Sequence, residues 1–321
     1  MWADLPAGTT LTVVDLADPD APRVVQRVEL GRHLYAATVN ARGDLLATST
    51  SQAGGELVVA RLGDDGLVAD HVALATGVVG EVNDRERGIN AVRFHPTDDV
   101  LAANVDDRRL AFLRVDRGPG GELGVSAVGE PLEVARHWSV GNWHPGGSTF
   151  VLSDVNWGPG RLGAVLNGRG SLVSVRYDAA GGHAVVDRVR VGLSPEGFDL
   201  SPDGSLAVVA NMRRTYMPPR GFWFVPGKSR ASLSLVGVDG ATGALEMLHD
   251  DVGFVGALPE DAVFDADGTS VAVAVYHDRA ELHPRRGWVD FWEVRGGRRL
   301  AYTGRRVAVT RGVHNLLLVE P

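Results

Sequence analysis

The chain of 321 residues is 44% hydrophobic and 22% charged, as expected for a globular protein that buries a substantial core. Its net charge of −8 argues against a surface built for nucleic acid, so we expect no nucleic-acid partner. Because the chain has no cysteine, disulfides, thiolate nucleophiles, Cys-ligated zinc and iron–sulfur clusters are excluded.

The N-terminal stretch MWADLPAGTTLTVVDL has neither the basic segment nor the apolar segment of a secretory signal. We therefore expect a cytoplasmic protein, although a trimmed, exported chain would look the same. The aromatic stretch 213–230 contains two consecutive prolines and falls far short of the roughly 20 apolar residues that a membrane span requires. No membrane partner is expected.

A recurring segment organises the chain: an apolar run, a tight polar turn containing Gly or Asp, and a second apolar run. Each copy predicts a β-hairpin, whose strands we call a and b. The copies are LYAATVNARGDLLATST (34–50), INAVRFHPTDDVLAANV (89–105), SVGNWHPGGSTFVLSDV (139–155), PEGFDLSPDGSLAVVAN (195–211) and PEDAVFDADGTSVAVAV (259–275).

A third strand, c, follows each hairpin, and weaker fourth strands, d, follow some of these. The predicted c strands are ELVVARL (56–62), RLAFLRVD (109–116), SLVSVRYD (171–178), SLSLVGVD (232–239) and WVDFWEV (288–294), and the d strands include AVVDRVRV (184–191) and RLAYTGRRVAV (299–309). Four strands that repeat about every 55 residues are typical of propeller blades. The sequence predicts an all-β fold, a single β-propeller domain of four-stranded antiparallel blades over residues 1–321.

The two ends of the chain suggest how the ring of blades closes. TLTVVDL (10–16) reads as a c strand with no hairpin before it, and VHNLLLVEP (313–321) reads as an a strand with no further strand after it. Joined, they would form one blade shared by the N-terminal and C-terminal strands, which would cover the open edges of the ring. Six units are counted in this way, and seven are possible.

The SPDG turn, the VVAN end of a b strand and the LVGVD type of c strand resemble the lactonase-like β-propellers. This superfamily includes propeller-type 6-phosphogluconolactonases and the YVTN-repeat proteins. The resemblance covers about residues 10–320 and implies a propeller, usually of seven blades. If the protein is an enzyme, the resemblance implies a lactonase-type hydrolase.

Three loops between b and c strands are long, residues 154–170, 211–230 and 277–287, and in a propeller they share one face, where binding is expected. Their net charges are +1, +5 and +1, so we expect this face to attract a small anionic ligand. Arg213 and Arg214 are the candidate anion ligands, and Trp223 is a candidate for stacking on the ligand. The alternative is that the arginines pair with nearby acids and the rings pin the loop.

Alignment of the a strands places a polar residue near one end of every strand. These residues are Tyr35, Asn90, Ser139, Glu196, Glu260 and Asn315. Because strand a is innermost in each blade, we expect their side chains to ring the central channel on the loop-rich face. His33, His137 and His314 lie one or two residues earlier and are expected to reach the same rim.

Such a ring is suited to three roles. It could hold a divalent cation such as Ca²⁺ through oxygen ligands, supply a general acid or base for attack of water on a carbonyl, or line a water-filled funnel. For the second role Glu196 and Glu260 are the candidate catalytic residues. The candidates for ligand binding are Tyr35, Asn90, Asn315, His33, His137 and His314. No HExxH, Gly-x-Ser-x-Gly or EF-hand motif favours one role, so Ca²⁺ stays open and no cofactor is assigned.

Two functions are therefore weighed. In the first, the protein binds a small sugar-acid or phosphate-like ligand and hydrolyses a lactone or ester. In the second, it is a non-enzymatic module whose arginine-rich and aromatic face docks a protein or polymer partner. The sequence leaves the choice between enzyme and docking module undecided.

Overall fold

The computed structural model describes residues 8–18, 20–32, 34–50, 56–79, 88–158, 162–217, 227–228, 230–277 and 286–318. The chain divides into two compact units, Met1–Glu133 with Ala179–Gly182 and Val134–Asp178 with His183–Pro321, called here the first and second unit. That both belong to one domain stays a prediction. In the described ranges, no helix combines the length and the apolar character needed to cross a lipid bilayer.

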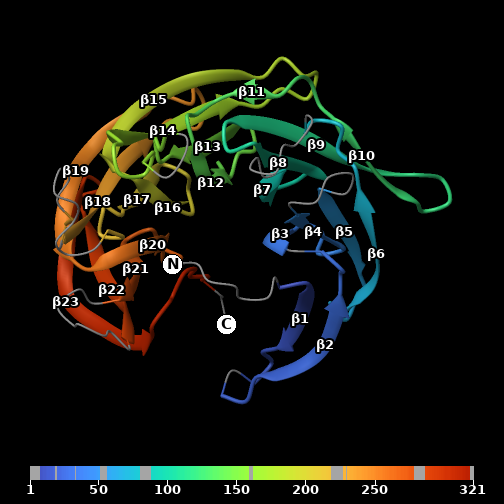
Figure 1. The fold of residues 1–321 in the computed structure, drawn as a ribbon, viewed down its shortest axis with the longest axis horizontal. Helices are drawn as coiled ribbons and strands as arrows, with labels where there is room; N and C mark the ends of the chain where they lie inside the picture. Colours follow the sequence, from blue (N-terminus) through green and yellow to red (C-terminus); the bar gives the residue numbers. More distant parts are fainter. Residues whose placement is uncertain are drawn as a thin grey trace. The chain divides into compact units, whose positions relative to one another are not determined.

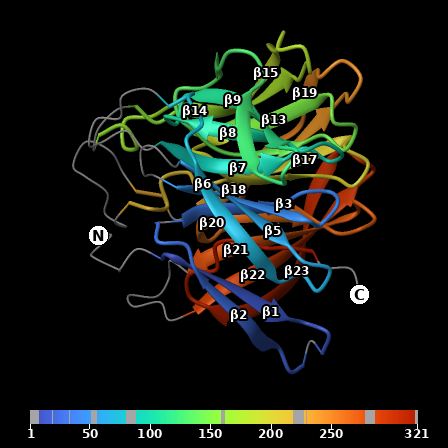
Figure 2. The same ribbon diagram turned by 90° about the vertical axis from the view of Figure 1, so that its right-hand side faces the viewer.

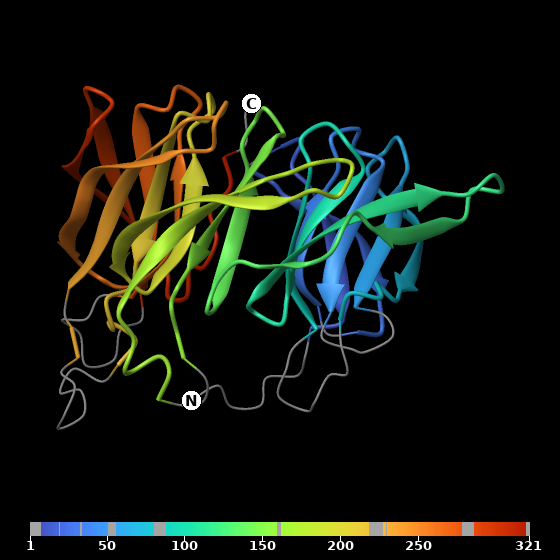
Figure 3. The same cartoon turned by 90° about the horizontal axis from the view of Figure 1, so that it is seen from above.

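The first unit contains one two-stranded sheet and two larger antiparallel sheets. Its strands are β1 (Thr10–Asp15), β2 (Arg23–Glu29), β3 (Leu34–Val39), β4 (Leu45–Thr50), β5 (Leu57–Leu62), β6 (Val68–Leu74), β7 (Ile89–Phe94), β8 (Val100–Val105), β9 (Arg109–Arg117), β10 (Leu123–Ala127) and β11 (Leu132–Glu133). Strands β3 to β6 pair in chain order, as do β7 to β10, with β11 added beside β9. The β1–β2 hairpin forms a sheet of its own (Figure 2), and the β9–β10 hairpin extends outward (Figures 1 and 3).

The second unit contains three four-stranded antiparallel sheets, each built from consecutive strands (Figure 1). The strands are β12 (Trp138–Trp143), β13 (Thr149–Asp154), β14 (Arg169–Arg176), β15 (Ala184–Leu193), β16 (Pro195–Leu200), β17 (Leu206–Asn211), β18 (Arg230–Val238), β19 (Leu245–Val255), β20 (Ala257–Phe264), β21 (Ser270–His277), β22 (Arg286–Arg295) and β23 (Arg299–Thr310). The first strands of the three sheets, β12, β16 and β20, are neighbours.

Apolar side chains between adjacent sheets hold each unit together. In the first unit, Leu57 and Leu101 belong to one buried cluster that joins the β3–β6 sheet to the β7–β10 sheet. In the second unit, Val209 packs with residues of the preceding sheet, while Leu233 packs with residues of the following one. Four-stranded antiparallel sheets that pack face to face in chain order are the blades of a β-propeller, so the predicted fold class is confirmed.

The predicted strand order agrees closely with the structure. All five c strands form at the expected positions, and TLTVVDL becomes β1, which pairs with β2 as a c strand pairs with a d strand. The described residues form six sheets, as many as the units counted in the sequence. The three long loops also lie where expected, after β13, β17 and β21.

The predicted a strand at 313–321 is wrong over its described part, because residues 313–318 form no strand. The backbone turns at Gly312, whose φ of +95° is a conformation that glycine adopts readily. Beyond it, Leu316 N–H donates to the Asp261 carboxylate, at 3.0 Å, rather than to a strand carbonyl. This segment is therefore held by a side chain and not by the backbone hydrogen bonds of a strand. Closure of the ring by shared terminal strands stays a prediction.

Candidate active site

The polar residue near the start of each a strand lies at a break in strand pairing. In β3, β7, β12, β16 and β20 the register with the following strand shifts at this point, and the polar residue has no partner in the ladder. The residues concerned are Tyr35, Asn90, Ser139, Glu196 and Glu260. Such β-bulges bend a strand and re-aim a side chain, and they are frequent beside active sites.

In the first unit the bulge residues are neutral. The Tyr35 side chain is exposed, and the Asn90 amide group donates a hydrogen bond to the Asp107 carboxylate. The amide oxygen of Asn90 is buried and accepts no hydrogen bond from the described residues. His33, the third candidate of this unit, lies outside the described residues. No carboxylate of the predicted ring therefore belongs to this unit.

In the second unit the bulges bring acidic groups together. Glu196 lies near the start of β16, and Glu260 lies in the neighbouring strand β20. The two backbones approach each other closely here, because a Cβ atom on Gly197 would lie 2.2 Å from the Glu260 carbonyl oxygen. Only glycine permits that approach. On the other side of Glu196, the Ser139 hydroxyl of β12 donates a hydrogen bond of 2.6 Å to Glu196 Oε1. The serine, which was aligned with the ring but given no role, orients a predicted catalytic residue.

The pKa of each carboxyl group is raised above its ordinary value. Burial raises the pKa of Glu196, while the hydrogen bond from Ser139 and the nearby His137 and His314 act in the opposite direction. Burial and the neighbouring charge of Glu196 raise the pKa of Glu260 to about 8. Glu260 therefore keeps its proton at neutral pH. Neighbouring carboxyl groups with such unequal environments are suited to act as an acid and a base.

Two histidines flank the carboxyl pair. His314 Nε2 lies 3.7 Å from Glu260 Oε2, with the Glu260 side chain 10% exposed and that of His314 58% exposed. The His314 ring also contacts the amide oxygen of Asn315, at 3.0 Å from Nδ1. His137 packs against the Trp157 ring with 5.5 Å between centroids. The structure thus gathers His137, His314 and Asn315 with the two glutamates in the second unit.

A divalent cation finds few partners in the described part of the chain. Calcium ordinarily takes six to eight oxygen ligands, with several from carboxylates. Among the described residues, no group of three or more His, Asp or Glu side chains is arranged to hold a metal ion.

Glu260→Gln is expected to change the pH dependence of stability. Because the folded pKa of Glu260 lies above its ordinary value of 4.5, its favourable contribution is complete below pH 4.5 and is lost as the pH rises to about 8. Glutamine carries no charge, so at pH 9 we expect the variant to gain about 1–2 kcal/mol over wild type. This is less than the full shift because the buried amide brings N–H groups that need hydrogen-bond partners.

Urea denaturation at pH 4 and pH 9 measures this gain. The quantity compared at each pH is the free energy of unfolding of wild type and of the variant. Glu246→Gln, at an exposed ion pair with Arg298 in the same unit, is the matched control. A Glu260→Gln variant whose relative stability is the same at both pH values would contradict a proton held by the buried carboxyl.

Arg213 and Arg214 of the 211–230 loop each contact another described residue of the protein. Arg213 Nη2 lies 3.8 Å from Asp251 Oδ2, and Arg214 Nη2 donates to the Asn167 carbonyl oxygen at 2.8 Å. Both residues have positive φ, +51° and +60°, a strained backbone that recurs at functional sites. The pairing of Arg213 is the alternative that the sequence left open. Trp223 lies outside the described residues.

A cluster of buried polar side chains lies beside the carboxyl pair, and the sequence points to only some of its members. Ser194 is fully buried with a φ of +53°, and its hydroxyl accepts from Trp157 Nε1 at 3.1 Å and lies 3.2 Å from the Tyr216 hydroxyl. The Asn167 side-chain amide lies 2.6 Å from the same hydroxyl. The aromatic residues stand out in the long loops, but nothing in the sequence marks Ser194. The cluster joins two loops to the start of β16 and supports His137 through Trp157.

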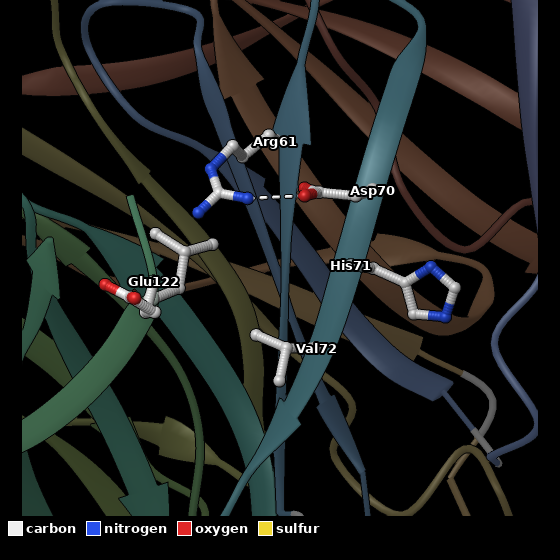
Figure 4. Close-up of a pocket in the computed structure, with 6 residues that line it drawn as sticks. Arg61, Asp70, His71, Val72 and Glu122 are labelled. Carbon is white, nitrogen blue, oxygen red and sulfur yellow. Dashed lines mark hydrogen bonds and ion pairs between the residues drawn. The ribbon is translucent and has the colours of Figure 1, made fainter. Parts of the chain in front are cut away.

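A shallow hollow in the first unit contains none of the predicted site residues (Figure 4). It is lined by Arg61 and Asp70, which point toward each other and form an ion pair, and by Glu122 from the β9–β10 hairpin. Since Arg61 and Asp70 are paired with each other and none of the predicted site residues lies here, the second unit holds the better candidate.

Solved structures share the fold of this chain. A protein from Bacteroides uniformis provisionally assigned as a 6-phosphogluconolactonase is 15% identical, with a TM-score of 0.68 over 96% of this chain and 81% of the other. The periplasmic gluconolactonase of Pseudomonas aeruginosa is 16% identical, with a TM-score of 0.62 over 91% and 74%.

The β-propeller domain of Myceliophteria thermophila Cps50 (Swd1) is also similar, at 12% identity and a TM-score of 0.54 over 88% of this chain and 76% of that chain. Searches of protein-family models and of curated proteins found no match. At these identities the likeness concerns the fold alone, which is that of a β-propeller.

Proposed function

We propose that the protein hydrolyses a lactone, or a related ester, of a small sugar acid at the carboxyl pair of the second unit. The observation that carries the proposal is the pair itself: Glu196 and Glu260 start from bulges of neighbouring strands, and one keeps its proton at neutral pH. The likeness in fold to the Bacteroides protein and to the Pseudomonas gluconolactonase adds support.

The chemistry follows from the proton that Glu260 keeps at neutral pH. Glu196, whose ionised form accepts the Ser139 hydrogen bond, takes a proton from a water molecule as that water attacks the lactone carbonyl carbon. The tetrahedral intermediate then collapses, the bond between the carbonyl carbon and the ring oxygen breaks, and Glu260 gives its proton to that oxygen. The product is an open hydroxy acid, and a proton passes from Glu196 back to Glu260 through solvent to complete the cycle.

The substrate is proposed to be anionic because the long loops carry an excess of positive charge. Arg213 and Arg214 lead the most basic of these loops, and Arg213 is the more available of the two, since its distance to Asp251 exceeds that of a hydrogen bond. Docking of a protein or polymer partner on the same loops is the competing function, and absence of turnover on every substrate would favour it.

The test is the rate of hydrolysis of gluconolactone, phosphogluconolactone and simple esters between pH 5 and pH 10, with spontaneous hydrolysis subtracted. Turnover should fall about tenfold per pH unit above pH 8, as Glu260 loses the proton that it must donate. It should also fall at acid pH, as Glu196 becomes protonated. A rate that keeps rising through pH 10 in proportion to hydroxide would contradict the proposed acid, and no turnover on any substrate would contradict the function.

A further inference from the structure

Two arginine side chains converge on one glycine at the end of the β18–β19 hairpin. Arg213 follows β17 and Arg230 begins β18, so they stand at the two ends of the 213–230 loop. A Cβ atom on Gly253 would lie 3.5 Å from Arg213 Nη1 and 3.5 Å from Arg230 Nε. Two guanidinium groups thus contact the same point of the backbone, although like charges repel each other.

The charges around Gly253 leave this point positive. Arg230 Nη2 donates to the Gly253 carbonyl oxygen at 2.8 Å, a neutral acceptor, and no carboxylate in the described part of the chain forms an ion pair with it. Asp251 lies 3.8 Å from Arg213, and one of its oxygens already accepts from the Ser232 hydroxyl. One partly engaged carboxylate therefore faces Arg213, and Arg230 forms no ion pair in the described residues.

The neighbouring arginines behave differently. Arg169 pairs with Asp250, and Arg306 forms a two-pronged pair with Asp290. Each of these cations has its own acid, so neither accounts for the excess charge at Gly253 nor competes for an incoming anion.

The backbone around Gly253 is also unusual. Arg213 and Asp251 both have positive φ, +51° and +49°, a conformation that costs free energy and persists where the surrounding structure requires it. Gly253 lies within β19, opposite Ser232, and glycine inside a strand often marks a place where another group approaches closely. The missing side chain leaves the space between the two guanidinium groups open.

We propose that Arg213 and Arg230 form a binding site for a phosphate-type anion over Gly253. Guanidinium groups bind phosphate oxygens through paired N–H donors, and a dianion would neutralise both cations at once. The site deepens the proposed hydrolysis and rests on it for the substrate, since Arg213 is the anion ligand named there, and it adds Arg230 and the open backbone at Gly253. The ligand is free phosphate or the phosphate group of a monoester.

Isothermal titration of the full chain with inorganic phosphate, at constant ionic strength set with chloride, tests the site. We expect saturable binding to wild type, weakened at least tenfold in Arg230→Ala. Gly253→Glu should abolish binding by placing a carboxylate between the two arginines, whereas Gly253→Ala, whose Cβ makes only ordinary contacts, should retain it. Arg295→Ala, at an exposed pair with Glu293, is the matched control and should bind as wild type does.

A parallel titration with methyl phosphate and a sugar phosphate distinguishes the two sources of the anion. Tighter binding of the sugar phosphate identifies a monoester, and equal binding identifies free phosphate. Phosphate binding that survives both Arg230→Ala and Gly253→Glu, or wild type that shows no saturable binding, overturns the proposal. Hydrolysis is measured separately on the same variants, so failure of the anion site and failure of the proposed enzyme are distinguishable.

Discussion

Lactone hydrolysis is expected to fall about 10²–10⁴-fold when Glu196 is replaced by glutamine, the range typical for loss of a general base. Glutamine keeps the size of the side chain and can still accept the hydrogen bond from Ser139, but its amide cannot take a proton from water. The variant should therefore fold and bind substrate with little change in KM, while kcat falls by the factor given above. Steady-state kinetics on the best substrate of the panel gives both constants.

The companion variants make the result specific. Glu260→Gln should also lose turnover, and it should lose the decline of the wild-type rate above pH 8, because no acid remains to be titrated. Glu246→Gln, in an exposed ion pair on the same sheet as Glu196, should keep the wild-type rate. If Glu196→Gln binds the substrate and turns it over at the wild-type rate, the carboxyl pair is not the catalytic site.

A second large effect is expected at the ion pair that joins β22 to β23. Asp290 is 1% exposed, and Arg306 binds it through Nε at 2.6 Å and Nη2 at 2.8 Å, with its guanidinium group 5.0 Å from the centre of the Trp288 ring. Arg306→Leu would leave the Asp290 carboxylate buried without its cation. Removal of one partner of such a pair typically costs about 3–5 kcal/mol of unfolding free energy.

Guanidinium chloride unfolding of wild type and variants measures this loss. Addition of Asp290→Asn to Arg306→Leu should recover much of the stability, because the uncompensated buried charge is then removed. Arg295→Leu, at an exposed pair with Glu293 in the same sheet, should cost no more than about 1 kcal/mol. A loss at Arg306 as small as that at Arg295 would show that the pair contributes little.

The fold could be predicted from the sequence because its signals are local. Each hairpin carries its own alternation of apolar runs and its own turn, so the a, b and c strands of the five hairpin units, and the d strands β15 and β23, were found from their own residues. The segment after Gly312 carries the same apolar signal but forms no strand over 313–318. Its outcome depends on a tertiary partner, the Asp261 carboxylate, that the local pattern does not reveal.

The candidate site was predictable in position but not in geometry. Alignment of the a strands identified Glu196 and Glu260, because each stands at the same distance from its turn. The bulge that aims them depends on how two strands pair. Their raised pKa values depend on burial and, for Glu260, also on the neighbouring charge of Glu196. The contacts of Arg213 with Asp251 and Gly253 likewise arise from β19, some 40 residues away, and no spacing rule connects them.

The repeated bulge also bears on how such a protein can change over generations. The residue at each bulge belongs to no cross-strand pair, so exchanging its side chain leaves the hydrogen-bonded ladder of the sheet in place. The five strands already hold tyrosine, asparagine, serine and two glutamates there. Mutation can therefore change the functional group at one blade at a time. A lineage can acquire a new reactive side chain while the hydrogen-bonded sheets that carry it stay the same.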